Sequence, residues 1–341
     1  MKNLLKLTTT TAALMAATTA FAEDRPIAMI IAQGGLGDAS WNDTAFAGFQ
    51  SGLEKTGLEG RPIESADVVA QGEEIMRRAA DGGFGLVLSL EWIHGEPMEK
   101  LATDYPDTNW VIMNQTREGA NIASVVFGEH EGSFLAGALA AQVTTDTSIE
   151  GINADAVLGV IGGFKAPGID KFIAGYIQGA QAVNPDIDVK VAYADSFGDP
   201  AKGEQMANAM FDAGADIVYQ VAGGTGIGII EAAKARGAYA IGVDSDQDGL
   251  APGHVLTSMV KRVDVAVDSV IADYAAGSFP GGEVISFGLS ENGVGLSEMT
   301  HTKDRIPAAY LAKVDEMKAQ IIAKEIDVWD VSTQGYPDYL K

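Results

Sequence analysis

Short runs of apolar and β-branched residues alternate along the chain with longer segments of helical periodicity. The runs cover residues 27–32, 85–90, 109–114, 157–163, 189–197, 216–224 and 239–244. Runs that are apolar on both faces are typical of strands buried in a parallel sheet. The pattern therefore predicts an α/β protein built from repeated strand–helix units, arranged in two doubly wound lobes with a hinge.

Between these runs lie helix-like segments, three of which (residues 43–57, 200–214 and 226–237) end on a glycine suited to a left-handed cap. Further on we expect a strand at 254–260, a helix at 263–275, a strand near 283–289 and a helix at 307–323. The expected boundaries are 23–125 and 247–280 for an N-terminal lobe, and 126–246 and 281–330 for a C-terminal lobe. A ligand is expected between the lobes, at the carboxyl ends of the strands.

The first 22 residues have the pattern of a cleaved secretory signal. Two lysines precede a small and apolar stretch, which closes on AFA before Glu23. Cleavage after about Ala22 and export to the periplasm are therefore expected, with a short N-terminal anchor helix as the alternative. No other stretch approaches the roughly 20 apolar residues that a membrane helix needs.

Composition narrows the possible partners. The 341 residues include 47 acidic and 23 basic ones, for a formal net charge of −24, and loss of Lys2 and Lys6 with the leader makes the charge more negative. This balance argues against nucleic acid and anionic membranes as partners. The absence of cysteine excludes disulfides, thiol chemistry and a lipidated cysteine. We expect a monomer.

Polar and aromatic residues follow directly after the predicted strands, where a ligand cleft would lie. They are Gln33, Asp38, Ser40, Trp41, Asn42, Asn114, Gln115, Phe197, Asp199, Gly223–Gly226, Asp244, Ser245 and Asp246.

Trp41 is the largest of these side chains. It follows Ser40, a good residue for a helix N-cap, so its ring can project from a helix start into the cleft. A planar ligand stacked there would gain about 1–3 kcal/mol. Tyr219 is the candidate for the facing ring and Phe197 a weaker one. Packing in the core is the alternative for Trp41 and for Tyr219.

Two loops invite a reading as ligand sites. The glycines of AGGTGIG (222–228) precede a helix and resemble a phosphate-binding turn, but the spacing and the lysine of a P-loop are missing. The turn at Asp244 can accept hydrogen bonds from vicinal hydroxyls. DSDQDG also imitates the start of a calcium loop, but lacks the glutamate at the twelfth position. Lys261 follows the strand at 254–260 and can reach the cleft.

Nothing in the sequence indicates catalysis, a bound metal or a cofactor. The four histidines are scattered, and no paired catalytic constellation appears. His130 could approach the hinge, and its neighbours Glu129 and Glu131 are interpreted as an ordinary helix start. An enzyme such as a nucleoside hydrolase would need a base or a metal that the sequence does not supply.

Several segments together resemble one family. GGLGDASWN resembles the GG-x-x-D-x-SFN stretch of the basic membrane protein (BMP) family of bacterial ABC-transporter substrate-binding proteins, whose members include purine nucleoside receptors. FGEHEGSFLAGALAA, DSFGDPAKG, GADIVYQVAGGTGIG, IGVDSDQ and VLTSMVKR match further family motifs in the family's order. The likeness covers about residues 25–330. It implies a periplasmic-binding-protein fold of type I and a purine nucleoside held between two rings.

The resemblance also implies roles for individual residues. Trp41 stands where the family usually has phenylalanine, and Tyr219 falls where the opposing ring would be. The other matches imply contacts to the ligand by Asn42, Gly224, Asp244 (on ribose hydroxyls) and Lys261. Gln33 and Asp38 are candidates from the same loop. An inner-membrane ABC permease is the implied partner.

Two departures bear on the ligand. The family usually carries aspartates where this chain has Ala32 and Asn114. Asn114 can donate as well as accept, so the pattern read on the base should change. Riboflavin or a sugar, held by the same fold, are the alternatives to a purine nucleoside.

Overall fold

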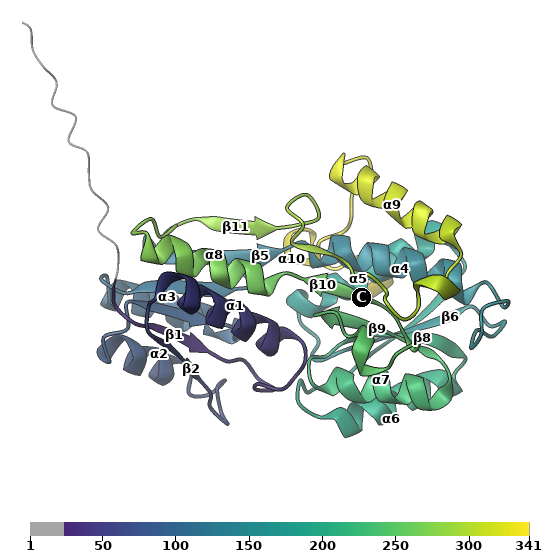
Figure 1. The fold of residues 1–341 in the computed structure, drawn as a ribbon, viewed down its shortest axis with the longest axis horizontal. Helices are drawn as coiled ribbons and strands as arrows, with labels where there is room; N and C mark the ends of the chain where they lie inside the picture. Colours follow the sequence, from purple (N-terminus) through teal and green to yellow (C-terminus); the bar gives the residue numbers. More distant parts are fainter. Residues whose placement is uncertain (1–23, 341) are drawn as a thin grey trace, which may run out of the picture.

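The computed structural model describes residues 24–340, which form two six-stranded sheets, each the centre of one lobe (Figure 1). The predicted leader, residues 1–22, lies outside the described residues. Within 24–340, no helix has the length and apolar character to cross a membrane.

The first lobe contains a wholly parallel sheet with the strand order β11-β5-β4-β3-β1-β2. Its strands are β1 (Ile27–Ile30), β2 (Gly60–Ile63), β3 (Leu86–Ser89), β4 (Asn109–Met113), β5 (Ile122–Phe127) and β11 (Val284–Phe287). Its helices are α1 (Trp41–Thr56), α2 (Gly72–Asp81), α3 (Gly95–Asp104) and α8 (Val263–Ala275), with a 3-10 turn at Trp92–His94.

The second lobe has the strand order β12-β10-β9-β8-β6-β7, with only β12 antiparallel. Its strands are β6 (Val157–Gly162), β7 (Asp188–Tyr193), β8 (Ala215–Val221), β9 (Tyr239–Asp244), β10 (Val255–Lys261) and β12 (Val294–Leu296). Its helices are α4 (Glu129–Thr144), α5 (Pro167–Val183), α6 (Pro200–Asp212), α7 (Thr225–Arg236), α9 (Ala308–Ile322) and α10 (Val331–Gln334), with 3-10 turns at Asp248–Leu250, Lys303–Arg305 and Asp338–Leu340.

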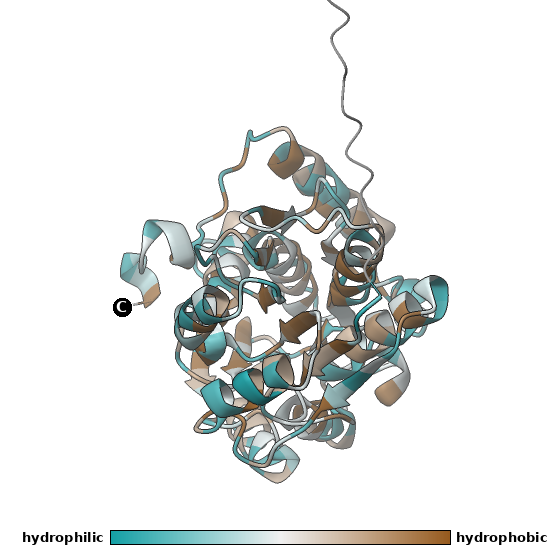
Figure 2. Ribbon diagram, turned by 90° about the vertical axis from the view of Figure 1, so that its left-hand side faces the viewer, coloured by the Kyte–Doolittle hydropathy of each residue, from teal (hydrophilic) through white to brown (hydrophobic). Residues whose placement is uncertain are grey.

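The buried strands explain why the apolar runs predicted the fold. All residues of β1, β3, β6, β8 and β9 are buried, as expected for strands covered by helices on both faces. In Figure 2 the hydrophobic colour gathers on the interior strands, while the outer helices carry hydrophilic segments. The prediction of two doubly wound α/β lobes is confirmed.

Two strands were not singled out by the pattern. In β2 the sequence is GRPI, and the strand lies at the sheet edge with no fully buried residue. An edge strand tolerates proline and needs no continuous apolar run, so its signal is weak. In β5 the small residues Ala123 and Ser124 interrupt the run.

The predicted lobe boundaries need two corrections. The strand β10 lies in segment 247–280, predicted for the N-terminal lobe, but it pairs with β9 of the second sheet. The strand β11 lies in segment 281–330, predicted for the C-terminal lobe, but it pairs with β5 of the first sheet. The reason is that the chain crosses between the lobes directly after β10 and again after β11, and only α8 of the earlier segment packs on α1.

Three chain crossings connect the lobes, at 127–129, 261–263 and 287–294. They are hydrogen-bonded to one another. The amide of Gly128 donates to the Phe287 carbonyl (3.0 Å), and the amide of Arg262 donates to the Gly293 carbonyl (2.8 Å). The rings of Phe127 and Phe287 also stack, with centroids 5.5 Å apart. This joined set of crossings forms the hinge that the sequence predicted.

In the second lobe, α4 and α5 pack with their backbones unusually close. The close approach depends on glycine, because a Cβ at Gly137 would collide with the Tyr176 carbonyl and one at Gly179 with the Phe134 carbonyl. Interiors are packed so densely that such a collision requires the helices to move apart.

We therefore expect Gly179→Ala to lower the free energy of unfolding by about 1–3 kcal/mol, the usual cost of overpacking a core. Urea denaturation measures this. Gly168→Ala in the same helix is the matched control, because a Cβ there would meet no described atom within 4 Å. The control should be neutral or slightly stabilising. Equal stability of the two variants would contradict the packing described for α4 and α5.

Candidate functional site

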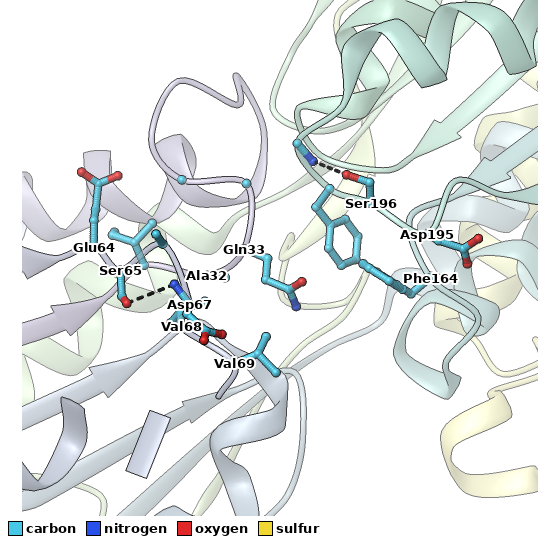
Figure 3. Close-up of a pocket in the computed structure, with 16 residues that line it drawn as sticks. Ala32, Gln33, Glu64, Ser65, Asp67, Val68, Val69, Phe164, Asp195 and Ser196 are labelled. Carbon is cyan, nitrogen blue, oxygen red and sulfur yellow. Dashed lines mark hydrogen bonds between the residues drawn. The ribbon is translucent and has the colours of Figure 1, made fainter. Parts of the chain in front are cut away.

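The carboxyl ends of the two sheets face each other across a cleft between the lobes. The first lobe contributes Gln33 after β1, and the second contributes Phe164 after β6 and Phe197 after β7. A cavity of about 820 Å³ lies here, and the other residues that line it include Glu64–Val69 and Asp195–Gly198. In Figure 3, Gln33 projects from the first lobe toward the two phenylalanines of the second. This volume lies in the range of small-molecule sites, about 300–1,000 Å³.

Phe197 and Phe164 form the aromatic wall of the cavity. Their ring centroids are 5.2 Å apart, with a 58° angle between the planes. The Phe197 ring rests on Gly163, where a Cβ would collide with it. A pair of tilted rings offers a stacking surface to a planar ligand.

The prediction that Tyr219 supplies the facing ring is wrong. Tyr219 is fully buried in β8, its ring is 5.1 Å from that of Tyr176, and its hydroxyl lies 3.1 Å from Ser133 Oγ. The alternation of side chains along a strand directs this ring into the core against α4, away from the cleft. Phe197, the weaker candidate in the sequence, lines the cavity instead.

Trp41 is half-buried at the first position of α1. Its indole Nε1 donates to the Leu90 carbonyl (3.3 Å), and the Lys261 ammonium lies 4.3 Å from its ring centroid. The ring is therefore held against Leu90 and Lys261 instead of lining the cavity described above. An ammonium at this distance from an aromatic face is attracted to it.

Asp38 and Asn42 shape the loop before α1. The Asp38 carboxylate accepts from the amides of Ser40, Asn42 and Asp43 at 2.9–3.1 Å, so it caps the helix. Burial raises the pKa of Asp38, and these three amides oppose the shift. Asn42 is fully buried, accepting from the Ala32 amide (3.0 Å) and donating to the carbonyl of Gln33 (3.2 Å). Both side chains bind the protein's own backbone.

Asn114 and Asp244 stand at strand ends in the left-handed backbone region, with φ of 64° and 65°. Asparagine and aspartate tolerate this conformation better than most residues, and such positions gather at functional sites. Asn114 Oδ1 accepts from Lys261 Nζ at 2.8 Å, and Asp244 Oδ2 accepts from Ser40 Oγ at 2.6 Å. Each bond joins one lobe to the other.

The pKa of Asp244 is raised to about 6. Burial is the main cause, Lys261 and the Ser40 hydroxyl oppose it, and the negative charges of Asp38 and Glu129 add to it. A carboxyl group tuned to this range changes its hydrogen bonding between mildly acidic and neutral pH.

Glu129, the first residue of α4, is fully buried between two lysines at the hinge. Its carboxylate lies 2.7 Å from Lys261 Nζ and 2.5 Å from Lys171 Nζ. Burial would raise the pKa of Glu129, but the two ammonium groups outweigh it and hold that pKa below its usual range. Burial also lowers the pKa of Lys261, against the attraction of Glu129 and Asp244.

The loop of residues 34–40 is already closed onto the second lobe. Ser245 Oγ and Gln247 Nε2 both donate to the Ala39 carbonyl, at 2.6 and 3.0 Å. Gly224 faces the same loop, and a Cβ there would lie 3.6 Å from the Cβ of Asp38. Gly224 therefore belongs to the contact between the lobes, where predicted, and its amide heads α7.

The acidic turn does not gather its carboxylates. Asp246 accepts from the amide of Asp248, Asp248 accepts from the amide of His301, and Asp244 binds Ser40. Among residues 24–340, no three acidic or histidine side chains converge as metal ligands would.

Sequence reasoning missed four residues of this site: Glu91, Glu129, Phe164 and Lys171. The notable case is Glu129, whose segment FGEHEG was interpreted as an ordinary helix start. It is one, but the helix begins at the hinge, where its first carboxylate is buried. The signal that could have found it is the placement of an acidic residue directly after a buried strand.

Comparison with known proteins identifies relatives along nearly the whole chain. The model of the Bmp family, described as ABC transporter substrate-binding protein PnrA-like, matches residues 26–332. A Listeria innocua protein named CD4+ T-cell-stimulating antigen is 33% identical over 328 residues, covering 90% of this chain and 88% of that protein. The ABC transporter nucleoside-binding protein BmpA of Lactococcus lactis is 31% identical, with coverage of 87% and 88%.

Solved structures give the same picture. A solute-binding protein of an ABC transporter system from Aeropyrum pernix K1 superposes with a TM-score of 0.82 at 28% identity, covering 90% of this chain and 93% of that one. A solute-binding protein from Bacillus halodurans with bound myo-inositol has a TM-score of 0.61 at 13% identity, covering 89% and 100%, and is similar in fold alone. The predicted periplasmic-binding-protein fold of type I is confirmed.

Glu129→Gln tests the buried ion pairs at the hinge. We expect it to lower the free energy of unfolding by about 3–5 kcal/mol, because two buried lysines lose the charge that compensates them. Glu74→Gln is the control, since the Glu74–Arg78 pair is about two-thirds exposed and should contribute little. Denaturation curves of both variants give the answer. A Glu129→Gln protein as stable as the control would refute the role of this carboxylate.

Proposed function

Since the chain belongs to the PnrA-like Bmp family of ABC transporter substrate-binding proteins, we propose that it closes its two lobes around a purine nucleoside and delivers it to an importer. Proteins of this kind bind small molecules and work with a membrane permease. The single observation that carries the choice of ligand is the cleft itself, where an aromatic wall faces hydrogen-bonding strand ends across about 820 Å³. The name of the Lactococcus relative, nucleoside-binding protein BmpA, supports the same choice.

The proposed binding mode assigns the flat base to the aromatic side chains and the ribose to the charged ones. Phe197 and Trp41 stack on the base from opposite lobes as the cleft closes. Asp244 accepts from the ribose hydroxyls, and Lys261 donates to them. Asn114 presents its amide toward the base. A ligand that touches both lobes stabilises the closed form, because only that form offers all of its contacts.

The remaining calls from the sequence complete this proposal. The protein works as a periplasmic monomer after loss of residues 1–22. It carries no cofactor and performs no catalysis. Its membrane partner is the permease of an inner-membrane ABC importer, and its acidic surface makes nucleic acid an unsuitable partner.

Binding of guanosine, inosine, adenosine, riboflavin and ribose to the purified protein tests the proposal. We expect micromolar or tighter affinity for at least one purine nucleoside in calorimetry. Tight binding of ribose alone would favour a sugar receptor, and tight binding of riboflavin alone a flavin receptor. Release of free base from a nucleoside would reveal an enzyme.

Trp41→Ala is expected to weaken nucleoside binding by about 1–3 kcal/mol, the usual contribution of one stacked base. Trp41→Phe should retain most of the affinity, because it keeps an aromatic face. Tyr219→Phe is the control, since Tyr219 is buried outside the cleft. Calorimetric titration of the three variants measures the effect. Unchanged affinity of Trp41→Ala would remove this ring from the binding mode.

Acid is expected to weaken binding through Asp244. The pKa of this carboxyl is about 6 in the unliganded protein, and the protonated form loses acceptor capacity toward hydroxyls. Affinity should therefore fall by about tenfold from pH 7 to pH 5. Asp244→Asn should bind more weakly at pH 7 and lose most of this pH dependence. Titrations at pH 5, 6 and 7 measure both.

Folding stability provides the control for that experiment, because the same group acts on it with the opposite sign. The folded pKa of Asp244 lies above its ordinary value of 3.8, so the folded state binds the proton more tightly than the unfolded chain. The contribution of Asp244 to stability is present at low pH and declines as the pH rises from about 4 to about 6. A loss of binding at pH 5 that follows a loss of folding would contradict the proposed cause.

A further inference from the structure

Glu91 is a buried carboxylate that the binding mode above does not use. It follows β3, and its side chain is 1% exposed. Oε2 accepts from the amide of Gln33 at 3.1 Å and from Gln33 Nε2 at 3.4 Å. Oε1 is buried and has no hydrogen-bond partner within residues 24–340. A buried carboxylate oxygen without a donor is costly unless something else supplies one.

The position of Glu91 places it in the ligand cleft. The register pairs Ile30 with Ser89, and Ser89 with Ile112. Two residues further on, at the carboxyl edge of the sheet, Glu91 therefore stands between the ends of β1 and β4, beside Asn114. Trp41 lies against the same segment through its bond to the Leu90 carbonyl.

Gln33 separates Glu91 from the cavity. Gln33 is partly exposed and projects into the space between the lobes (Figure 3). Its side-chain contact to Glu91, at 3.4 Å, is at the weak end of hydrogen bonds. A ligand can displace this amide at little cost and take its place beside Glu91.

The neighbouring histidine does not account for the unpartnered oxygen. His94 Nδ1 is bonded to Ser89 Oγ and Nε2 to the Val68 carbonyl, both at 2.8 Å. Both ring nitrogens are therefore occupied, so Oε1 of Glu91 is left for a group from outside the chain.

Resting on the proposed function, we propose that Glu91 selects the base: its free oxygen accepts the N1–H of a 6-oxopurine nucleoside such as inosine or guanosine. An ionised carboxylate only accepts hydrogen bonds. In a 6-oxopurine, N1 carries a proton and lies beside the O6 acceptor, for which Gln33 Nε2 supplies a donor. In adenosine, N1 is itself an acceptor and faces the carboxylate with a lone pair. A site built around one hydrogen-bond pattern discriminates against the reverse pattern, because buried polar groups are left unpaired.

The test compares inosine, guanosine and adenosine on the wild type and on Glu91→Gln by calorimetry. A hydrogen bond to a charged group corresponds to about a 10- to 100-fold change, so the wild type should prefer inosine over adenosine by about that factor. Glu91→Gln keeps the size of the side chain but adds a donor, and should remove or reverse the preference. Glu96→Gln, exposed on the next helix, should preserve it.

Each outcome bears on a different statement. Equal affinity of the wild type for inosine and adenosine, or a uniform loss for all nucleosides in Glu91→Gln, overturns the role of Glu91 and leaves nucleoside binding in place. Failure of the wild type to bind any nucleoside overturns the proposed function as well. As a second readout, ¹⁵N-labelled inosine should show a protected N1 imino proton when bound to the wild type, and a loss of that protection in Glu91→Gln.

Discussion

The buried contact between Glu129 and its two lysines is the constraint on which the rest of the site depends. Glu129 opens α4 directly after one chain crossing, and Lys261 ends β10 directly before another. A carboxylate and an ammonium removed from water must stay together, since separating them leaves an uncompensated charge. The pair therefore fixes the relative position of two crossings. Lys171 adds a third anchor from α5.

The same ammonium of Lys261 carries this constraint into the cleft. It accepts no hydrogen bond, so every partner it has must be an acceptor or an aromatic face. Asn114 Oδ1 provides the first kind and Trp41 the second, both from the opposite lobe. The orientation of Asn114 is thereby set, with its oxygen toward the lysine and its amino group left for other partners. A hinge contact and a recognition residue are in this way one network.

The sequence predicted the lobes well because strands covered on both faces must be apolar throughout, and β1, β3, β6, β8 and β9 are. Strand ends also had to meet, so residues such as Asn114 and Asp244 could be placed near the cleft. Side-chain direction was beyond the pattern: Tyr219 precedes a glycine loop yet points into the core. Equally, no periodicity reveals that Glu129 is buried, since a helix start rich in acid is usually solvated.

Closure of the cleft involves a competition at Asp244. In the unliganded structure its carboxylate accepts from Ser40 Oγ, and the loop of Ser40 is also bound through the Ala39 carbonyl. These contacts join the lobes without any ligand, so closure alone does not require one. A ligand hydroxyl that uses the same carboxylate replaces part of this latch, and the net gain is the difference between the two sets of contacts. Affinity therefore depends most on contacts for which the unliganded protein has no substitute, and stacking on the base is the foremost of these.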